Sequence, residues 1–155
     1  AVVAPVSPNA DLLRTWSGTS LTGSITGTIT DTSDNSSTPY SGTLTGEDLT
    51  YTVTFTETPN LVTSQGTYGI ESVITIDSET MTFNDTGETF LDTGNATWTR
   101  NGGALIITDG ADVDTFSLSI NGNTMTLSGT DMNSDVDGTE TNTSTINAIL
   151  TFTKQ

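Results

Sequence analysis

The chain has 155 residues and a formal net charge of −16, with only Arg14, Arg100 and Lys154 positive. This length predicts one domain with a single core, which we place at residues 12–155 after a tail at residues 1–11. So acidic a surface repels phosphates and anionic lipids, and no apolar run approaches the ~20 residues of a membrane-spanning helix. We therefore expect neither a nucleic acid partner nor a membrane span.

The N-terminal segment begins with the apolar stretch AVVAPV. Ser7 is a good helix N-cap residue and Pro8 suits the first helical position, so we expect one short helical turn here. The apolar stretch itself has two interpretations. It either covers its own domain or adds as a strand to the exposed sheet edge of a neighbouring molecule.

The chain after Trp16 alternates apolar residues with Ser, Thr and Gly along most of its length. Alternation at period 2 is typical of strands that place one face on a core and the other in water. The inward glycines between Leu21 and Ile29 suggest bending or a close approach of backbones. Leu49, Tyr51, Val53 and Phe55 give the same alternation further along the chain.

Two Asn-Gly pairs, Asn101-Gly102 and Asn121-Gly122, separate strand-like runs. Asn-Gly is typical of two-residue hairpins with a type I′ turn, which needs positive φ at both central residues. With turns at such short spacing, we expect an all-β, antiparallel up-and-down barrel of about 8–10 strands.

Several short stretches are similar to lipocalin-like domains of secreted proteins and surface lipoproteins of the Bacteroidetes type. The stretches are Leu12-Leu13-Arg14-Thr15-Trp16, Ala104 to Thr108, Leu118 to Ser128, and Leu150 to Lys154. The resemblance implies a lipocalin-like barrel of about eight strands, exported to the outer surface of a bacterial cell or secreted. It also implies a possible lipid anchor upstream. Gly is usual where Arg14 stands, and Arg14 or Lys154 is expected to cover Trp16 by a cation–π contact.

Five aromatic residues are candidates for lining a ligand cavity: Trp16, Tyr51, Phe55, Trp98 and Phe116. The same side chains could instead fill the core, since a barrel of ~8 strands either packs its interior or holds one small ligand. A non-catalytic, exported binding module for a small apolar molecule, a glycan or a protein partner is our leading expectation. The alternative is a structural subunit of a surface assembly or adhesive filament, which self-associates through the N-terminal tail.

The chain has neither Cys nor His, which removes the commonest catalytic nucleophile–base combinations. The pairs Glu47/Asp48 and Asp77/Glu79 suggest turn or strand-face charge more than a hydrolytic site, which needs two carboxylates facing across a cleft. We therefore expect no enzymatic activity and no certain cofactor.

Calcium is the one cofactor that the sequence suggests. The segment Asp131 to Glu140 is expected to be an acidic loop in which Asn133, Asp135, Asp137 and Gly138 match the first half of a calcium-binding loop. The twelfth place is Ser144 instead of Glu, and Glu140 or Asp131 would have to substitute. The alternative is a solvated acidic loop without a metal ion.

Overall fold

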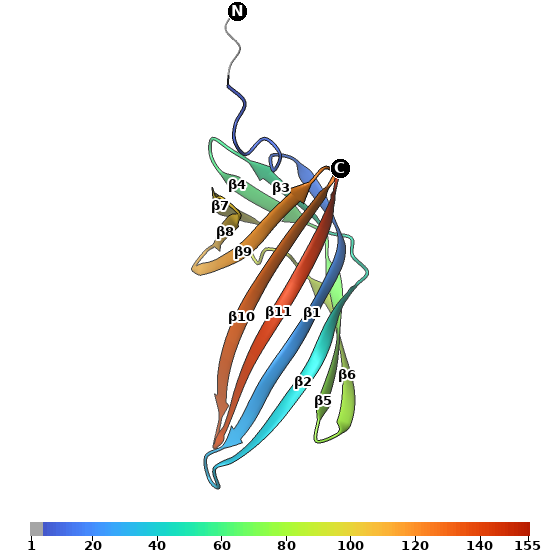
Figure 1. The fold of residues 1–155 in the computed structure, drawn as a ribbon, viewed down its shortest axis with the longest axis vertical. Coiled ribbons are helices and arrows are strands. Elements are labelled where there is room, and N and C mark those ends of the chain that lie inside the picture. The colour runs from blue at the N-terminus through green and yellow to red at the C-terminus, as the bar shows by residue number, and fades with distance from the viewer. Residues whose placement is uncertain (1–4) are drawn as a thin grey trace, which may run out of the picture.

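The computed structural model describes residues 5–155 and contains eleven strands, paired throughout as antiparallel neighbours (Figure 1). The strands are β1 (Thr15–Asp31), β2 (Ser36–Glu47), β3 (Thr52–Thr56), β4 (Leu61–Gln65), β5 (Tyr68–Ile76), β6 (Glu79–Glu88), β7 (Asn95–Asn101), β8 (Ala104–Asp109), β9 (Asp112–Asn121), β10 (Thr124–Asp137) and β11 (Glu140–Lys154). No helix occurs among these described residues. The prediction of an all-β antiparallel fold is confirmed.

Eight strands close into a barrel at the end of the molecule where β1 begins and β11 ends (Figure 1). Their order is β1, β3, β4, β7, β8, β9, β10 and β11, and the pairing of β11 with β1 completes the circle. The closing register runs from Trp16 opposite Lys154 to Asp31 opposite Glu140, with one irregularity between Gly18 and Ser20. The expected closed barrel is therefore present, with eight strands.

The barrel interior is filled by side chains from alternate strand positions. Trp16, Val53, Phe55, Leu105 and Phe152 are each at most 1 % exposed and belong to one continuous core. Close packing of such large apolar side chains supplies most of the stabilising burial in a small domain. This continuous core lies in the barrel end of the molecule, and Tyr40 on β2 is buried apart from it.

Tyr51 shows how tightly this interior is packed. A side chain at Gly18 would place its Cβ 2.3 Å from the Tyr51 ring, so only glycine fits beneath that ring. Burial raises the pKa of the Tyr51 hydroxyl. The ring of Phe152 packs edge-on against Tyr51 with 5.7 Å between their centres.

The hairpin turns differ from the expected type I′ geometry. The two-residue loops are Gly102-Gly103 and Gly122-Asn123, and only their first residues, Gly102 and Gly122, have positive φ, both 61°. Positive φ at the first central position alone is the type II′ pattern, which requires Gly there. The Asn of each Asn-Gly pair, Asn101 or Asn121, is the last residue of the preceding strand. Asp77-Ser78 between β5 and β6 has positive φ at both positions, as a type I′ turn demands.

The expected helical turn near the N-terminus is wrong. Residues 8–12 form hydrogen-bonded turns and no helix. The Ser7 hydroxyl accepts a hydrogen bond from the backbone N–H of Asn9, as an N-cap side chain does, but the turns that follow do not continue into a helix. The chain must enter β1 almost at once, because the Arg14 carbonyl already accepts a hydrogen bond from the Phe55 N–H.

Candidate functional site

The five aromatic residues expected to line a ligand cavity lie in or against the core. Trp16, Tyr51, Phe55 and Trp98 are at most 2 % exposed, and the half-buried Phe116 packs against the core. The indole N–H of Trp98 donates to the carbonyls of Thr56 and Leu61, which fixes the ring. This packing explains all five as core residues, and their ligand-lining role stays a prediction.

Trp16 is covered by a basic side chain, as the resemblance implies, and Arg14 provides this cation–π contact. The guanidinium of Arg14 lies 5.7 Å from the centre of the Trp16 ring, which is a cation–π distance. The Trp16 indole N–H donates to the Leu12 carbonyl at 3.1 Å. Trp16 therefore closes the barrel end beneath Arg14.

The acidic segment expected to be a calcium loop is a strand, and that loop prediction is wrong. Asp131 to Asp137 continue β10 and pair with β11, and only Gly138 and Thr139 form the turn. In an extended strand, alternate residues lie about 6.6 Å apart along one row. Asn133, Asp135 and Asp137 thus form a row on one face of β10, and Glu140 lies opposite Asp137 on β11. No group of three or more potential carboxylate, Cys or His metal ligands occurs within residues 5–155.

Beyond the barrel, three of its strands continue into an open sheet that we call the extension (Figure 1). The extension comprises Thr22–Asp31 of β1, Gly129–Asp137 of β10, Glu140–Ala148 of β11, and the whole of β2, β5 and β6. β2 pairs with β1, β5 with β2, and β6 with β5. β6 and the distal part of β10 are its two free edges.

One face of the extension continues the inward-facing series of the barrel. The core residues Leu21, Leu127 and Leu150 are followed at every second position by Gly23 on β1, Gly129 on β10 and Ala148 on β11. We call this the inner face. Because nothing closes a barrel here, apolar residues on it stay partly exposed, including Met81 at 41 % and Phe83 at 49 %.

The first part of the inner face is an apolar hollow of about 280 Å³. Its lining comprises Ile25, Ile29, Tyr40, Ile74, Ile76, Met81, Phe83, Asn142 and Ser144. Gly27 provides the space for Tyr40, since a Cβ there would lie 2.2 Å from the Tyr40 ring. The Tyr40 hydroxyl donates to Asn142 Oδ1 across that glycine at 2.7 Å.

The second part is a wedge where β9 and β10 separate. Their pairing ends at Ser117 opposite Ser128, after which β9 continues with β8, and β10 continues with β11. The gap between the two strands is a groove of about 350 Å³. Phe116 and Val113 form one wall, and Ile146 and Ala148 form its floor. Ile146 pairs with Ile25, which also lines the apolar hollow. The wedge and the hollow therefore share one apolar floor.

Carboxylates line a second groove beside the wedge. This groove of about 460 Å³ is lined by Asp92, Asp109, Asp112, Asp114 and Asp131 together with Phe90, Leu91, Val113 and Asn133. Burial raises the pKa of Asp114, and the neighbouring carboxylates, Asp131 foremost, raise it further. Hydrogen bonds from Thr93 lower the pKa of Asp109.

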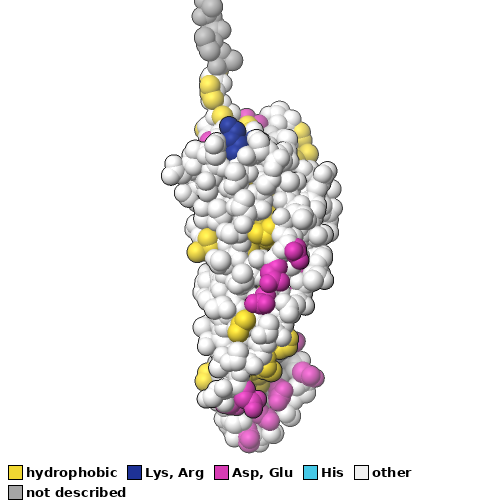
Figure 2. Space-filling model, turned by 90° about the vertical axis from the view of Figure 1, so that its right-hand side faces the viewer, with side chains coloured by type: hydrophobic (Ala, Val, Ile, Leu, Met, Phe, Trp, Pro, Cys, Tyr) yellow, Lys and Arg dark blue, Asp and Glu magenta, His cyan; other side chains and the backbone are white. Residues whose placement is uncertain are grey.

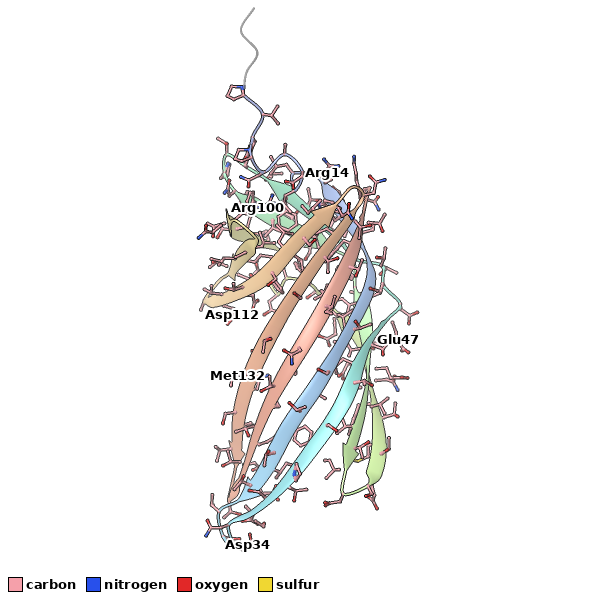
Figure 3. The ribbon with its side chains drawn as sticks, viewed as in Figure 1. Arg14, Asp34, Glu47, Arg100, Asp112 and Met132 are labelled. Carbon is pink, nitrogen blue, oxygen red and sulfur yellow. The ribbon has the colours of Figure 1, made fainter. Side chains whose placement is uncertain are left out.

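The positively charged residues lie outside the extension. Arg14 and Arg100 are at the barrel end (Figure 3), and Lys154 pairs with Trp16 in the barrel. Arg100 forms an ion pair with Asp11, with 2.7 Å between Nη1 and Oδ1. Figure 2 shows acidic side chains gathered on the extension with hydrophobic ones between them. The extension contains no Lys, Arg or His.

The sequence reasoning did not find this face, although it contains a usable signal. β1, β10 and β11 have 17, 14 and 15 residues, against about 5–6 in an average strand. Strands of this length with Gly at inward positions are too long for one small barrel. The inner face offers apolar area and carboxylate acceptors, which can bind a ligand.

Described residues 5–155 include no helix long and apolar enough to cross a membrane. Comparison of the chain with protein-family models, curated proteins and solved structures finds no match.

Proposed function

We propose that the chain is an exported, non-catalytic binding module that binds an apolar or amphipathic ligand on the inner face of the extension. The observation that carries this proposal is the continuous apolar floor from Phe83 through Ile25 to Ile146, which no other part of residues 5–155 covers. Exposed apolar patches of this kind on a small protein mark binding surfaces more often than chance exposure. The lipocalin-like resemblance supports export to a bacterial cell surface.

The filled barrel supports the extension as the binding site in preference to the barrel interior. A ligand in the interior would have to displace side chains such as Phe55 and Trp98, which pack edge-on with 6.1 Å between ring centres. Opening such a cavity costs several kcal/mol of lost packing. The inner face requires no such rearrangement, because Met81 and Phe83 are already exposed.

A neutral, solvatochromic dye such as Nile red tests this proposal, since its fluorescence rises on an apolar surface. We expect the wild type to enhance the dye, and the variant Met81→Ser/Phe83→Ser to lose most of this enhancement. The matched control is Val6→Ser/Leu61→Ser, which removes two exposed apolar side chains that line neither the hollow nor the wedge. Enhancement that survives in Met81→Ser/Phe83→Ser but falls in the control would overturn the proposal.

A second candidate function is a subunit of a surface filament that self-associates through the N-terminal tail. Its support is that Val6 is 81 % exposed and directly precedes Ser7, whose hydroxyl donates to Glu57 Oε2 just after β3, a strand of the barrel. Light scattering before and after removal of residues 1–6 tests this, and an unchanged molar mass would exclude it.

A further inference from the structure

The edge of β10 from Gly129 to Asp137 lacks a neighbouring strand. On this side β10 pairs with β9 only as far as Ser128, and no other strand of the described chain takes its place. A free edge presents a row of backbone N–H and C=O groups that can pair with an added strand. This edge has neither the Pro nor the Lys that commonly protect such strands.

The register identifies which backbone groups are free. The Asn121–Thr124 and Asp137–Glu140 pairs close two-residue hairpins and exchange hydrogen bonds across their turns. Hydrogen bonding to each neighbouring strand alternates from residue to residue, so the N–H and C=O groups of Asp131, Asn133 and Asp135 point towards β11. The N–H and C=O groups of Thr130, Met132, Ser134 and Val136 therefore point towards the free edge.

The side chains of this edge differ between its two faces. On the inner face Asp131, Asp135 and Asp137 form an acidic row, with Asn133 between the first two. On the outer face Met132 and Val136 are 78 % and 66 % exposed, which is unusual for large apolar side chains without a partner. A strand added here would lie beside both sets at once.

We propose that the β10 edge binds an extended peptide segment in which Lys or Arg alternates with apolar residues, and that this segment adds to the sheet as a further strand. Its basic side chains lie beside the acidic row on the inner face, and their aliphatic stems cover the apolar floor of the wedge. Its apolar side chains lie beside Met132 and Val136. The proposal rests on the proposed function, because it assigns a partner to the same inner face.

Charge also decides against other strands as occupants. A second copy's β10 would bring another acidic row to the edge, and β6 carries Glu79, Asp85 and Glu88. Like charges directly opposite each other across strands destabilise pairing. The N-terminal tail has no basic residue to pair with the acidic row. The edge therefore repels copies of itself and selects a basic partner.

The test is fluorescence anisotropy with a labelled, end-blocked peptide of alternating Val and Lys that spans Gly129–Asp137, at about 0.15 M salt. Two further peptides separate charge from strand formation. One replaces Lys by Glu, and the other keeps Lys but has N-methylated amides on alternate residues, which cannot form the backbone ladder. We expect both to bind at least about tenfold more weakly than the first peptide.

Matched protein variants locate the binding edge. Asp131→Asn/Asp135→Asn/Asp137→Asn should weaken binding about tenfold or more, whereas Glu79→Gln/Asp85→Asn/Glu88→Gln on β6 should change it little despite the same change in net charge. Ser134→Pro should also weaken binding, because it removes a free-edge N–H while leaving the β11 ladder intact. If Ser134→Pro fails to fold, the N-methylated peptide on the wild type answers the same question.

Three results would overturn the proposal: no binding of the Val-Lys peptide, equal binding of its N-methylated form, or equal losses in the β10 and β6 variants. Failure here with an intact dye response at Met81 and Phe83 would reject strand addition alone. Failure of the dye response as well would reject the inner face as a binding surface.

Discussion

Tyr40 and Asn142 are joined across an intervening strand. The Tyr40 hydroxyl on β2 donates to Asn142 Oδ1 on β11 at 2.7 Å, and the ring crosses β1 above Gly27. This bridge fixes the floor of the apolar hollow without a barrel to close it. The glycines of the extension are therefore structural requirements of the proposed binding face.

Substitution of these glycines by Ala should give a definite order of destabilisation. A Cβ at Gly42 would lie 2.3 Å from the backbone oxygen of Val73, which cannot move freely, whereas one at Gly27 would meet the Tyr40 ring, which can turn aside. We expect Gly42→Ala to cost about 2–3 kcal/mol and Gly27→Ala about 1–2 kcal/mol. Gly103→Ala is the control, with its nearest contact at 4.0 Å, and should be near neutral. Urea unfolding measures all three, and equal losses would contradict the packing described.

The aromatic residues of the barrel should behave as core residues. Phe55→Ala removes a side chain that is 1 % exposed, and we expect a loss of about 3–5 kcal/mol. Phe83→Ala removes the same ring from an exposed position and should cost much less. Unfolding by denaturant gives both values, with Phe55→Leu in reserve if the first variant does not fold. Equal stability of Phe55→Ala and the wild type would mean that the barrel interior has space for a ligand.

Features of this fold that depend on residues close together in the chain can be predicted from the sequence, whereas features that depend on strand pairing between distant residues cannot. The period-2 alternation around Phe55 and Leu127 is a local property, and it correctly indicates strands with one buried face. Closure of eight strands follows from many short antiparallel hairpins. Whether Ile25 faces a core or an open surface depends on which strand lies opposite, and this non-local information is absent from the alternation.

The acidic segment of β10 shows the same limit. Asp131, Asn133, Asp135 and Asp137 match a calcium loop in their spacing, but alternate residues also occupy one face of a strand. Pairing with β11, far stronger than the local preference of Asp and Asn for turns, decides between these conformations. The lengths of β1, β10 and β11 signal an extension, but the free edge of β10 could not be predicted, because which edge stays unpaired depends on the pairing of every other strand.

The stability of the protein should respond to pH through Asp114. Burial and neighbouring carboxylates raise its pKa, so the folded state holds this proton more tightly than the unfolded state. Ionisation of Asp114 therefore costs stability above the folded pKa, and the cost disappears as pH falls through that raised value towards the unfolded pKa of about 3.9. Asp114→Asn should raise Tm at neutral pH and have little effect near pH 3.

Asp85→Asn on the β6 edge is the control for this prediction, since it removes the same charge at a site outside the carboxylate-lined groove that contains Asp114. We expect a smaller rise in Tm at neutral pH from it, because removal of any single charge relieves part of the repulsion in a chain of net charge −16. Equal rises in the two variants would show that Asp114 experiences only the overall charge.

Divalent cations should stabilise the protein by screening alone. Calcium needs 6 to 8 oxygen ligands at about 2.3–2.6 Å, and the extended row of Asn133, Asp135 and Asp137 spreads its oxygens along the strand. We therefore expect Ca²⁺ and Mg²⁺ at equal concentration to raise Tm by the same amount relative to EDTA, because both screen the repulsion among the carboxylates. Asp135→Asn/Asp137→Asn should keep this response, apart from the loss of two charges. A larger rise with Ca²⁺ than with Mg²⁺ that disappears in this variant would instead establish the calcium site that the spacing suggests.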